Sequence, residues 1–330
     1  MDFLKSSKEK IFQLGENDFQ SFALEVFYEQ STHNPIYNQY LKYLKIDPFQ
    51  VGSLEEIPFL PIEFFKFHRI VSADFQEKKI FESSGTTTSV NSKHGIEDLT
   101  FYQKVSEMIF SSFYGSLENY HILALLPSYL ERDNSSLVFM VDYFIKQSGS
   151  PYSGFFLNDW STLRGTLKAL QEDHSKKTLL IGVTFALLEL AEKYPMDLSS
   201  VIVMETGGMK GRRKEMLREE VHDFLKERLH LSEVHSEYGM TELLSQAYSP
   251  GNQVFYLPPW MRVLLRETHD PLCTNPNLKS GAMNIIDLAN LHSCAFIATQ
   301  DLGSLTSDKG FKIQGRLDHS DIRGCNLLYL

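Results

Sequence analysis

The sequence predicts an α/β fold built on a mostly parallel, doubly wound sheet, with a helical segment before it and a smaller β-rich region after it. Between about residues 97 and 229, strand-like apolar runs alternate with runs of helical period, and strands separated by crossover helices are typical of parallel sheets. Residues 16–45 carry apolar side chains at three- and four-residue spacing, which predicts helix. From about residue 250, short apolar pieces are separated by Asn, Asp, Gly and Pro, which favours short strands and turns.

The elements follow in order along the chain. The N-terminal helical segment is expected to be two helices that meet near Asn34-Pro35, and Pro58 and Pro61 then predict an extended stretch, because proline cannot continue a regular helix. Strands are expected at 120–129, 152–158, 178–184 and 200–206, and helices at about 97–114, 135–147, 159–173, 186–194 and 213–229. We expect three parts: a helical segment at 1–60, an α/β nucleotide-binding core at 61–249 and a β-rich subdomain at 250–330.

Composition excludes several classes of function. Hydrophobic residues make up 42% and charged residues 22% of the 330, as in folded globular proteins. With 32 basic and 42 acidic side chains the net charge is −10, so we expect no general attraction to nucleic acid or to anionic membranes. No apolar run approaches the roughly 18–20 residues of a membrane span, and the start of the chain lacks the apolar core of a secretory signal. These observations predict a cytoplasmic protein.

The three cysteines, Cys273, Cys294 and Cys325, are widely spaced. This pattern argues against a disulfide framework, a zinc ribbon or a Cys-x-x-Cys redox pair. Cys325 lies close to the end of the chain beside a glycine and near Arg323, which could favour the thiolate and makes it a candidate reactive thiol.

The most unusual stretch is "SSGTTTSVNSK", residues 83–93, which follows a strand-like run; we call it the hydroxyl-rich loop. Its hydroxyls, its backbone N–H groups and Lys93 suit a polyanion such as nucleotide phosphates. The loop matches neither the P-loop pattern nor the dinucleotide pattern of glycines. A solvated Ser/Thr loop is the alternative.

Two further motifs follow predicted strands or turns in the core. Gly207-Gly208 ends the apolar run "VIVMET", at the strand end where ligands of open α/β sheets bind; a tight strand-to-helix turn is the alternative. In "HSEYGMTELLSQAY", residues 235–248, Tyr238, Thr241 and Glu242 surround Gly239 in a turn that we expect to begin a helix. A carboxylate and a hydroxyl placed in this way can hold a magnesium ion that bridges nucleotide phosphates.

The last motif is C-terminal. Asp301 precedes Gly303 in "TQDLG", and Arg316 follows Gly315 in "GRLDHSDIRGC". A carboxylate can accept hydrogen bonds from both ribose hydroxyls, and arginine can pair with ribose or phosphate.

Together and in this order, the motifs resemble those of the adenylate-forming superfamily of acyl- and aryl-CoA ligases. "SSGTTTSVNSKH" is similar to its phosphate loop, "TGGMK" to its adenine-side loop, "YGMTE" to its Tyr-Gly-x-Thr-Glu motif, and "TQDLG" and "GRLDHSDIRG" to its ribose and hinge motifs. The stretches "IPFLPIEFFKFH", "PSYLERDNSSLVFMVDYFI" and "GRLDHSDIRGCNLL" look more specifically like LuxE-like acyl-protein synthetases. That resemblance runs from about residue 10 to the end and ends at the hinge, without the usual small C-terminal ligase domain and its adenylation lysine.

The resemblance implies ATP and Mg²⁺ as cofactors and a fatty or other carboxylic acid as substrate. It implies an acyl-AMP intermediate, transfer of the acyl group to Cys325, and delivery to a partner such as an acyl reductase or another acceptor protein. The ATP-binding residues that it implies are Ser83, Ser84, Gly85, Thr86, Thr87, Thr88, Gly207, Gly208, Met209, Tyr238, Gly239, Met240, Thr241, Asp301 and Arg316. Cys325, Thr241 and Glu242 would be catalytic, with Glu242 on the metal.

Two other functions remain open at this point. An acyl- or aryl-CoA ligase would form free acyl-CoA without Cys325. A nucleotide-binding scaffold that has lost catalysis would bind ATP and form no adenylate. A serine hydrolase is not indicated because no G-x-S-x-G occurs, and a zinc hydrolase is not indicated because no H-E-x-x-H occurs.

Overall fold

The computed structural model describes residues 3–72, 75–84, 90–127, 132–157, 159–207, 216–270 and 272–317. Contacts divide the chain into two compact units. Unit 1 comprises Met1–Phe64, Ile70–Ala73 and Pro259–Leu330, and unit 2 comprises Phe65–Arg69 and Asp74–Pro258. The first unit thus joins the N-terminal helices to the C-terminal strands; the predicted boundaries at residues 60 and 249 stay predictions.

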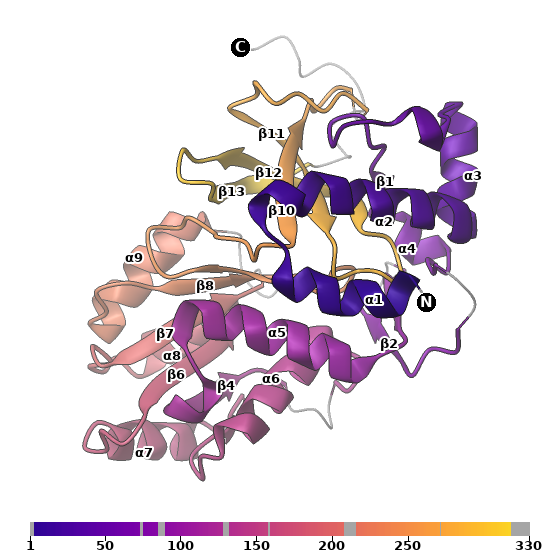
Figure 1. Ribbon diagram of the computed structural model, residues 1–330. Coiled ribbons are helices and arrows are strands. Elements are labelled where there is room, and N and C mark those ends of the chain that lie inside the picture. The colour runs from indigo at the N-terminus through magenta and orange to yellow at the C-terminus, as the bar shows by residue number, and fades with distance from the viewer. Residues whose placement is uncertain are drawn as a thin grey trace, which may run out of the picture. The chain divides into compact units, whose positions relative to one another are not determined.

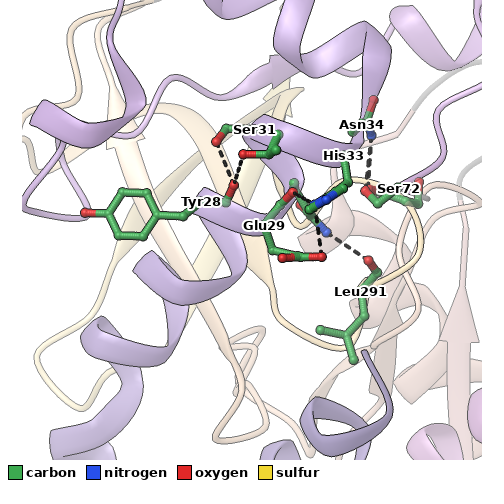
Figure 2. Close-up of polar contacts among 10 residues, drawn as sticks. Tyr28, Glu29, Ser31, His33, Asn34, Ser72 and Leu291 are labelled. Atoms are coloured by element: carbon green, nitrogen blue, oxygen red, sulfur yellow. Dashed lines mark hydrogen bonds and ion pairs between the residues drawn. The ribbon is translucent and has the colours of Figure 1, made fainter. Parts of the chain in front are cut away.

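The helices of unit 1 are α1 (Phe3–Lys10), α2 (Phe19–His33) and α3 (Pro35–Leu44), which confirms two helices that meet at Asn34-Pro35. Asn34 caps α3 by accepting a hydrogen bond from the Tyr37 N–H at 3.1 Å. Its Nδ2 donates to the Ser293 carbonyl at 3.2 Å. Figure 2 shows Asn34 directed toward Ser72, near the end of α2 where His33 lies beside Glu29.

The sheet of unit 1 is mainly antiparallel. Strands β10 (Met261–Arg266), β11 (Ser280–Asp287), β12 (Phe296–Leu305) and β13 (Phe311–Arg316) pair in sequence order, and β1 (Leu60–Pro61) runs parallel to the start of β12. Phe296 is fully buried, and its ring packs against Phe27, Tyr37 and Phe59. This aromatic cluster joins α2 and α3 to the sheet.

The main sheet of unit 2 has the order β5-β4-β6-β7-β8-β9. The strands are β4 (Tyr120–Leu125), β5 (Gly154–Phe155), β6 (Lys177–Val183), β7 (Val201–Thr206), β8 (His235–Tyr238) and β9 (Ala247–Ser249). All neighbours are parallel except β8 and β9. The mostly parallel α/β fold predicted from the sequence is confirmed (Figure 1).

Helices cover both faces of this sheet: α5 (Leu99–Tyr114), α6 (Ser136–Ser148), α7 (Trp160–Leu170), α8 (Thr184–Lys193) and α9 (Arg218–Leu229). Side chains of Asp98, Ser135 and Asp159 cap α5, α6 and α7. On one face, the Phe110 ring of α5 packs against Tyr248 of β9. On the other, the side chain of Glu205 in β7 lies beside α8 and α9.

A separate hairpin flanks the hydroxyl-rich loop. Its strands are β2 (Lys79–Glu82) and β3 (Lys93–Ile96), which pair antiparallel. The buried Phe81 ring contacts Tyr102 of α5 and Phe139 of α6. The Glu82 N–H also donates to the Asn134 carbonyl at 2.8 Å. The two ends of the loop are therefore anchored to the helical layer of unit 2.

Three local expectations change. The predicted helix after Glu242 is wrong, because turns lead from Tyr238 into strand β9, which pairs back onto β8. The stretch after Pro58 is extended only at β1, and a short helix, α4 (Phe64–Phe67), follows. The helix expected from residue 213 has its described start at Arg218. No helix in the described ranges is long and apolar enough to cross a membrane.

Candidate functional site

Three parallel strands of unit 2 end at one edge of the sheet, where open α/β folds bind ligands. Strand β6 is followed by Thr184 and β7 by Gly207, and the last residue of β8, Tyr238, leads into a turn. We call residues 238–242 the 238–242 turn. The strand register brings Thr206 opposite Glu237, so the ends of β7 and β8 are direct neighbours.

Gly207 follows β7 with φ 67°, in the left-handed region that favours glycine. The Thr184 hydroxyl lies 2.5 Å from the Gly207 carbonyl oxygen and 3.0 Å from Oε2 of Glu205. A hydroxyl has one hydrogen to donate, and the shorter contact indicates donation to Gly207. The first residue of α8 thus fixes the backbone that follows β7.

Glu205 is a buried carboxylate, with 2% of the residue exposed. Its Oε1 lies 3.4 Å from Nε of Arg218 and 3.7 Å from Nε2 of His222. Burial alone would raise the pKa of Glu205, but the charge of Arg218 and the interactions with His222 outweigh it, so the pKa lies below its ordinary value. Glu205 is therefore ionised at neutral pH.

Glu237 lies on the opposite face of the sheet and is 5% exposed. Its Oε2 accepts a hydrogen bond from the Thr206 hydroxyl across the β7–β8 pair. A Cβ atom added to Gly239 would lie under 3.0 Å from Oε1 of the same carboxylate, closer than real Cβ contacts. An alanine at this position would therefore have to displace the Glu237 carboxylate.

Within the 238–242 turn, Tyr238 and Glu242 are buried at 9% and 5% exposure. The Tyr238 ring packs edge-on to Phe255, with ring centroids 5.9 Å apart. The Thr241 carbonyl oxygen lies 2.8 Å from Nδ1 of His94 on β3. Since β3 begins where the hydroxyl-rich loop ends, this contact brings the loop's end to the turn.

The described part of the hydroxyl-rich loop is closed at its base. The Ser83 N–H donates to the Ser92 carbonyl at 3.0 Å, and the Ser92 N–H donates to the Ser83 hydroxyl at 2.9 Å. Ser84 is exposed. Nζ of Lys93 lies 3.8 Å from Oε1 of Glu82 and its side chain is 61% exposed, so the lysine can turn from this weak surface pair toward an anion.

In unit 1, Asp301 on β12 and Arg316 on β13 are Cα partners in the antiparallel ladder. Arg316 Nε lies 3.3 Å from Asp301 Oδ1, and its Nη2 lies 3.3 Å from Oε1 of Gln300. The Asp301 side chain is 14% exposed and that of Arg316 69%. The two residues predicted at the ribose are thus paired, although 15 positions separate them in the sequence.

Several predicted site residues lie outside the described residues: Gly85, Thr86, Thr87, Thr88, Gly208, Met209 and Cys325. Of the other cysteines, Cys294 is buried, and burial raises the pKa of its thiol to about 12. It would be protonated at neutral pH and is a poor nucleophile. Cys273 is half-buried.

The residues present fit a magnesium ion that is shared with a nucleotide. In the described residues no group of three or more His, Cys, Asp or Glu side chains could form a metal site without help. Magnesium is commonly held by one or two carboxylates together with substrate phosphates. Glu242, which follows Thr241 in the sequence, is the carboxylate that would serve in that arrangement.

Sequence reasoning missed the residues that hold the motifs in place: His94, Thr184, Thr206, Glu205 and Glu237. A signal existed for the two glutamates, since a charged residue inside the buried strands "VIVMET" and "HSEY" requires a partner. His94 and the threonines carry no comparable signal, because their partners are set by the tertiary structure.

The fold of the chain is that of the N-terminal domains of adenylate-forming ligases. ATP-bound MatB from Rhodopseudomonas palustris matches with a TM-score of 0.54 at 16% identity, over 74% of this chain and 50% of that chain. An open conformation of 2-hydroxyisobutyryl-CoA ligase, in complex with 2-HIB-AMP and CoA, matches with a TM-score of 0.62 at 13% identity, over 92% of this chain and 70% of that one. The chain thus spans about half the length of MatB.

The family comparison is more specific. The family model described as acyl-protein synthetase, LuxE, matches residues 4–125. The resemblance to LuxE-like acyl-protein synthetases is thereby confirmed over residues 4–125, and the resemblance to adenylate-forming ligases is confirmed by the shared fold. No curated protein sequence matches the chain.

Proposed function

We propose that this protein uses ATP to activate a carboxylic acid, with a fatty acid as the first candidate, and then carries the acyl group as a thioester on Cys325. An acyl reductase or another acceptor protein would receive it. The observation that carries the proposal is the arrangement in unit 2. Gly207, the 238–242 turn and, through His94, the end of the hydroxyl-rich loop lie at the carboxyl edge of a parallel sheet.

The match to the LuxE family model over residues 4–125 supports the acyl-protein synthetase assignment. The fold shared with ATP-bound MatB supports ATP as the nucleotide. In the proposed arrangement, residues 83–88 and Thr241 bind phosphates, Gly207, Gly208 and Met209 line the adenine, and Tyr238 stacks beside it. Asp301 and Arg316 bind the ribose, and Glu242 holds Mg²⁺, which would neutralise phosphate charge.

The first step is nucleophilic displacement at phosphorus. A carboxylate oxygen of the acid attacks the α-phosphorus of ATP, the bond to the bridging oxygen breaks, and pyrophosphate leaves. Hydroxyl and backbone donors of the hydroxyl-rich loop stabilise the charge on the phosphates. The product is a mixed acyl-phosphate anhydride.

In the second step, a thiolate attacks the acyl carbon, the bond from that carbon to the phosphate oxygen breaks, and AMP leaves. Cys325 is the proposed thiol. Cys294 is unsuited because burial keeps it protonated, with a pKa of about 12. A thioester preserves the activation of the acyl group for a following reductive or transfer step.

The proposal is tested by intact-protein mass spectrometry after incubation with Mg-ATP and a panel of carboxylic acids. We expect an acyl mass adduct that hydroxylamine removes, present in the wild type and in Cys273→Ser and absent in Cys325→Ser. The same spectra would identify the preferred acid, since the added mass reports its size.

Other outcomes assign other functions. AMP and pyrophosphate without an adduct would retain adenylation and move the acceptor elsewhere. Free acyl-CoA that still forms in Cys325→Ser would assign a CoA ligase. ATP binding without AMP from any acid would assign a nucleotide-binding scaffold and reject the proposed activity.

A further inference from the structure

We propose that His94 and Glu237 are positioning residues that hold the 238–242 turn in a binding-competent shape, an inference whose catalytic consequence rests on the proposed function. Both residues lie within the quoted motif stretches, but neither is among the residues that the resemblance implies as ligands or catalysts. Each joins the turn to a different neighbouring segment: His94 to the end of the hydroxyl-rich loop, and Glu237 to the end of β7.

His94 holds the Thr241 end of the turn. The residue is 1% exposed, and its Nδ1 lies 2.8 Å from the Thr241 carbonyl oxygen. A carbonyl oxygen only accepts, so Nδ1 must carry the hydrogen. The Phe65 ring packs edge-on to the imidazole at 5.6 Å. The contact therefore fixes the direction in which Thr241 presents its backbone.

Glu237 holds the Gly239 end. Its carboxylate accepts from the Thr206 hydroxyl, and Thr206 directly precedes Gly207. The carboxylate also lies against the backbone of Gly239, where a Cβ atom would approach within 3.0 Å. A movement of the turn toward this carboxylate would displace it from a buried hydrogen bond, which is costly.

The two contacts act on opposite ends of the same turn. They tie it to the two other segments of unit 2 that are proposed to bind the nucleotide, the hydroxyl-rich loop and the backbone that follows β7. Binding groups that are held in place before the ligand arrives lose less freedom on binding. We therefore expect the loss of either contact to loosen the turn selectively and to weaken ATP binding, while the sheet itself stays intact.

The decisive experiment is hydrogen–deuterium exchange on the full chain without ligand, with paired variants. His94→Ala removes the donor, and His94→Asn keeps an N–H near the position of Nδ1. Thr206→Val removes the hydroxyl at nearly constant shape, and Thr206→Ser keeps it. We expect the amides of residues 239–243 to exchange about tenfold faster in the Ala and Val variants, and near wild-type rates in the Asn and Ser variants.

Peptides from β4 and β6 serve as internal references and should exchange as in the wild type. Unchanged exchange at 239–243, or acceleration of equal size in β4 and β6, would overturn the inference, since the latter indicates a general structural role. This readout does not depend on any activity of the protein.

The second readout is ATP–pyrophosphate exchange with the preferred acid. We expect the KM for ATP to rise about tenfold in His94→Ala and Thr206→Val, with rescue in His94→Asn and Thr206→Ser. If the wild type shows no ATP–pyrophosphate exchange with any acid, the proposed function is rejected, and hydrogen–deuterium exchange alone decides the positioning role. An active wild type with an unchanged KM in both variants would reject the positioning role alone.

Discussion

The carboxylates at the ends of β7 and β8 and the Asp301–Arg316 pair differ in how they are held. Glu205 and Glu237 are 2% and 5% exposed, and each has polar partners from neighbouring strands or helices. The Arg316 side chain is 69% exposed, and its contacts to Asp301 and Gln300 are at 3.3 Å. Water thus reaches the second group through Arg316, although the Asp301 side chain is only 14% exposed, and hardly reaches the first group.

This difference separates two ways of placing a functional side chain. A buried charge must be paired, so its geometry is enforced by the cost of breaking the pair. An exposed pair contributes little energy; here the Asp301–Arg316 ladder register sets the alignment. We therefore expect substitutions in the first region to cost stability, and substitutions in the second to affect ligand binding alone.

The largest expected effect follows from Glu205→Gln. The change leaves Arg218 beside a neutral amide. Breaking this pair, in which Glu205 is buried and Arg218 is partly buried, should cost about 3 kcal/mol of unfolding free energy at pH 7. The measurement is urea denaturation. Glu219→Gln is the control, because Glu219 is exposed and lies on α9, the helix that carries Arg218.

The cost of Glu205→Gln should also depend on pH. The pKa of Glu205 is lowered in the folded state from an ordinary value of 4.5, because Arg218 and His222 outweigh the effect of burial. Its contribution is therefore present above pH 4.5 and lost as the pH falls through the folded-state pKa. Wild type and Glu205→Gln should differ less at pH 3 than at pH 7; an equal difference at both would contradict the assignment.

Gly239→Ala should have the next largest effect. The added Cβ would displace the Glu237 carboxylate and disturb its bond to Thr206, which we expect to cost about 2 kcal/mol. Gly165→Ala is a control of opposite sign. Nothing lies within 4 Å of a Cβ at Gly165 in α7, so alanine should raise helix stability by about 1 kcal/mol. Equal effects of the two substitutions would contradict the steric argument.

A smaller effect is expected for Ser83→Ala. The change removes the hydroxyl that accepts from the Ser92 N–H at 2.9 Å, and the loss of one part-buried hydrogen bond costs about 1 kcal/mol. Ser84→Ala, at an exposed neighbour, should leave stability unchanged. Comparable losses for the two serines in thermal denaturation would show that the base of the hydroxyl-rich loop is not closed by Ser83.

Much of the fold could be predicted from the sequence because buried parallel strands appear as continuous apolar runs, as at β6 and β7. Strand β8 could not, since His235, Ser236 and Glu237 do not form such a run. The helix predicted after Glu242 was wrong for a related reason. The apolar residues Leu243, Leu244 and Ala247 fit helical spacing as well as a short strand, and pairing with β8 decided between them.

For the candidate site, sequence predicted the motif residues and not their supports. The His94–Thr241 contact spans 147 positions, and the Thr206–Glu237 contact spans 31. Such pairs depend on how the hairpin and the sheet come together, which no local pattern encodes. The side chains that hold the predicted site residues therefore appear only in the structure, and the roles of those site residues stay predictions.

The smallest stability effect is expected for Arg316→Ala. An exposed pair contributes under about 1 kcal/mol, and the ladder keeps a backbone hydrogen bond nearby, from the Leu317 N–H to the Gln300 carbonyl at 2.7 Å. The alanine variant should unfold within about 1 kcal/mol of the wild type, while its KM for ATP rises about tenfold if Arg316 binds ribose.

A double-mutant cycle with Asp301→Ala separates these two roles. In unfolding, the coupling energy of the two residues should be below about 1 kcal/mol and should decrease in high salt, because water and ions screen the pair. The effects of the two substitutions on the KM for ATP should be less than additive, because both residues are proposed to bind the same ribose. A coupling energy in unfolding as large as the cost of Glu205→Gln would show that exposure does not distinguish the two regions. The β12–β13 register would then not be what aligns Asp301 with Arg316.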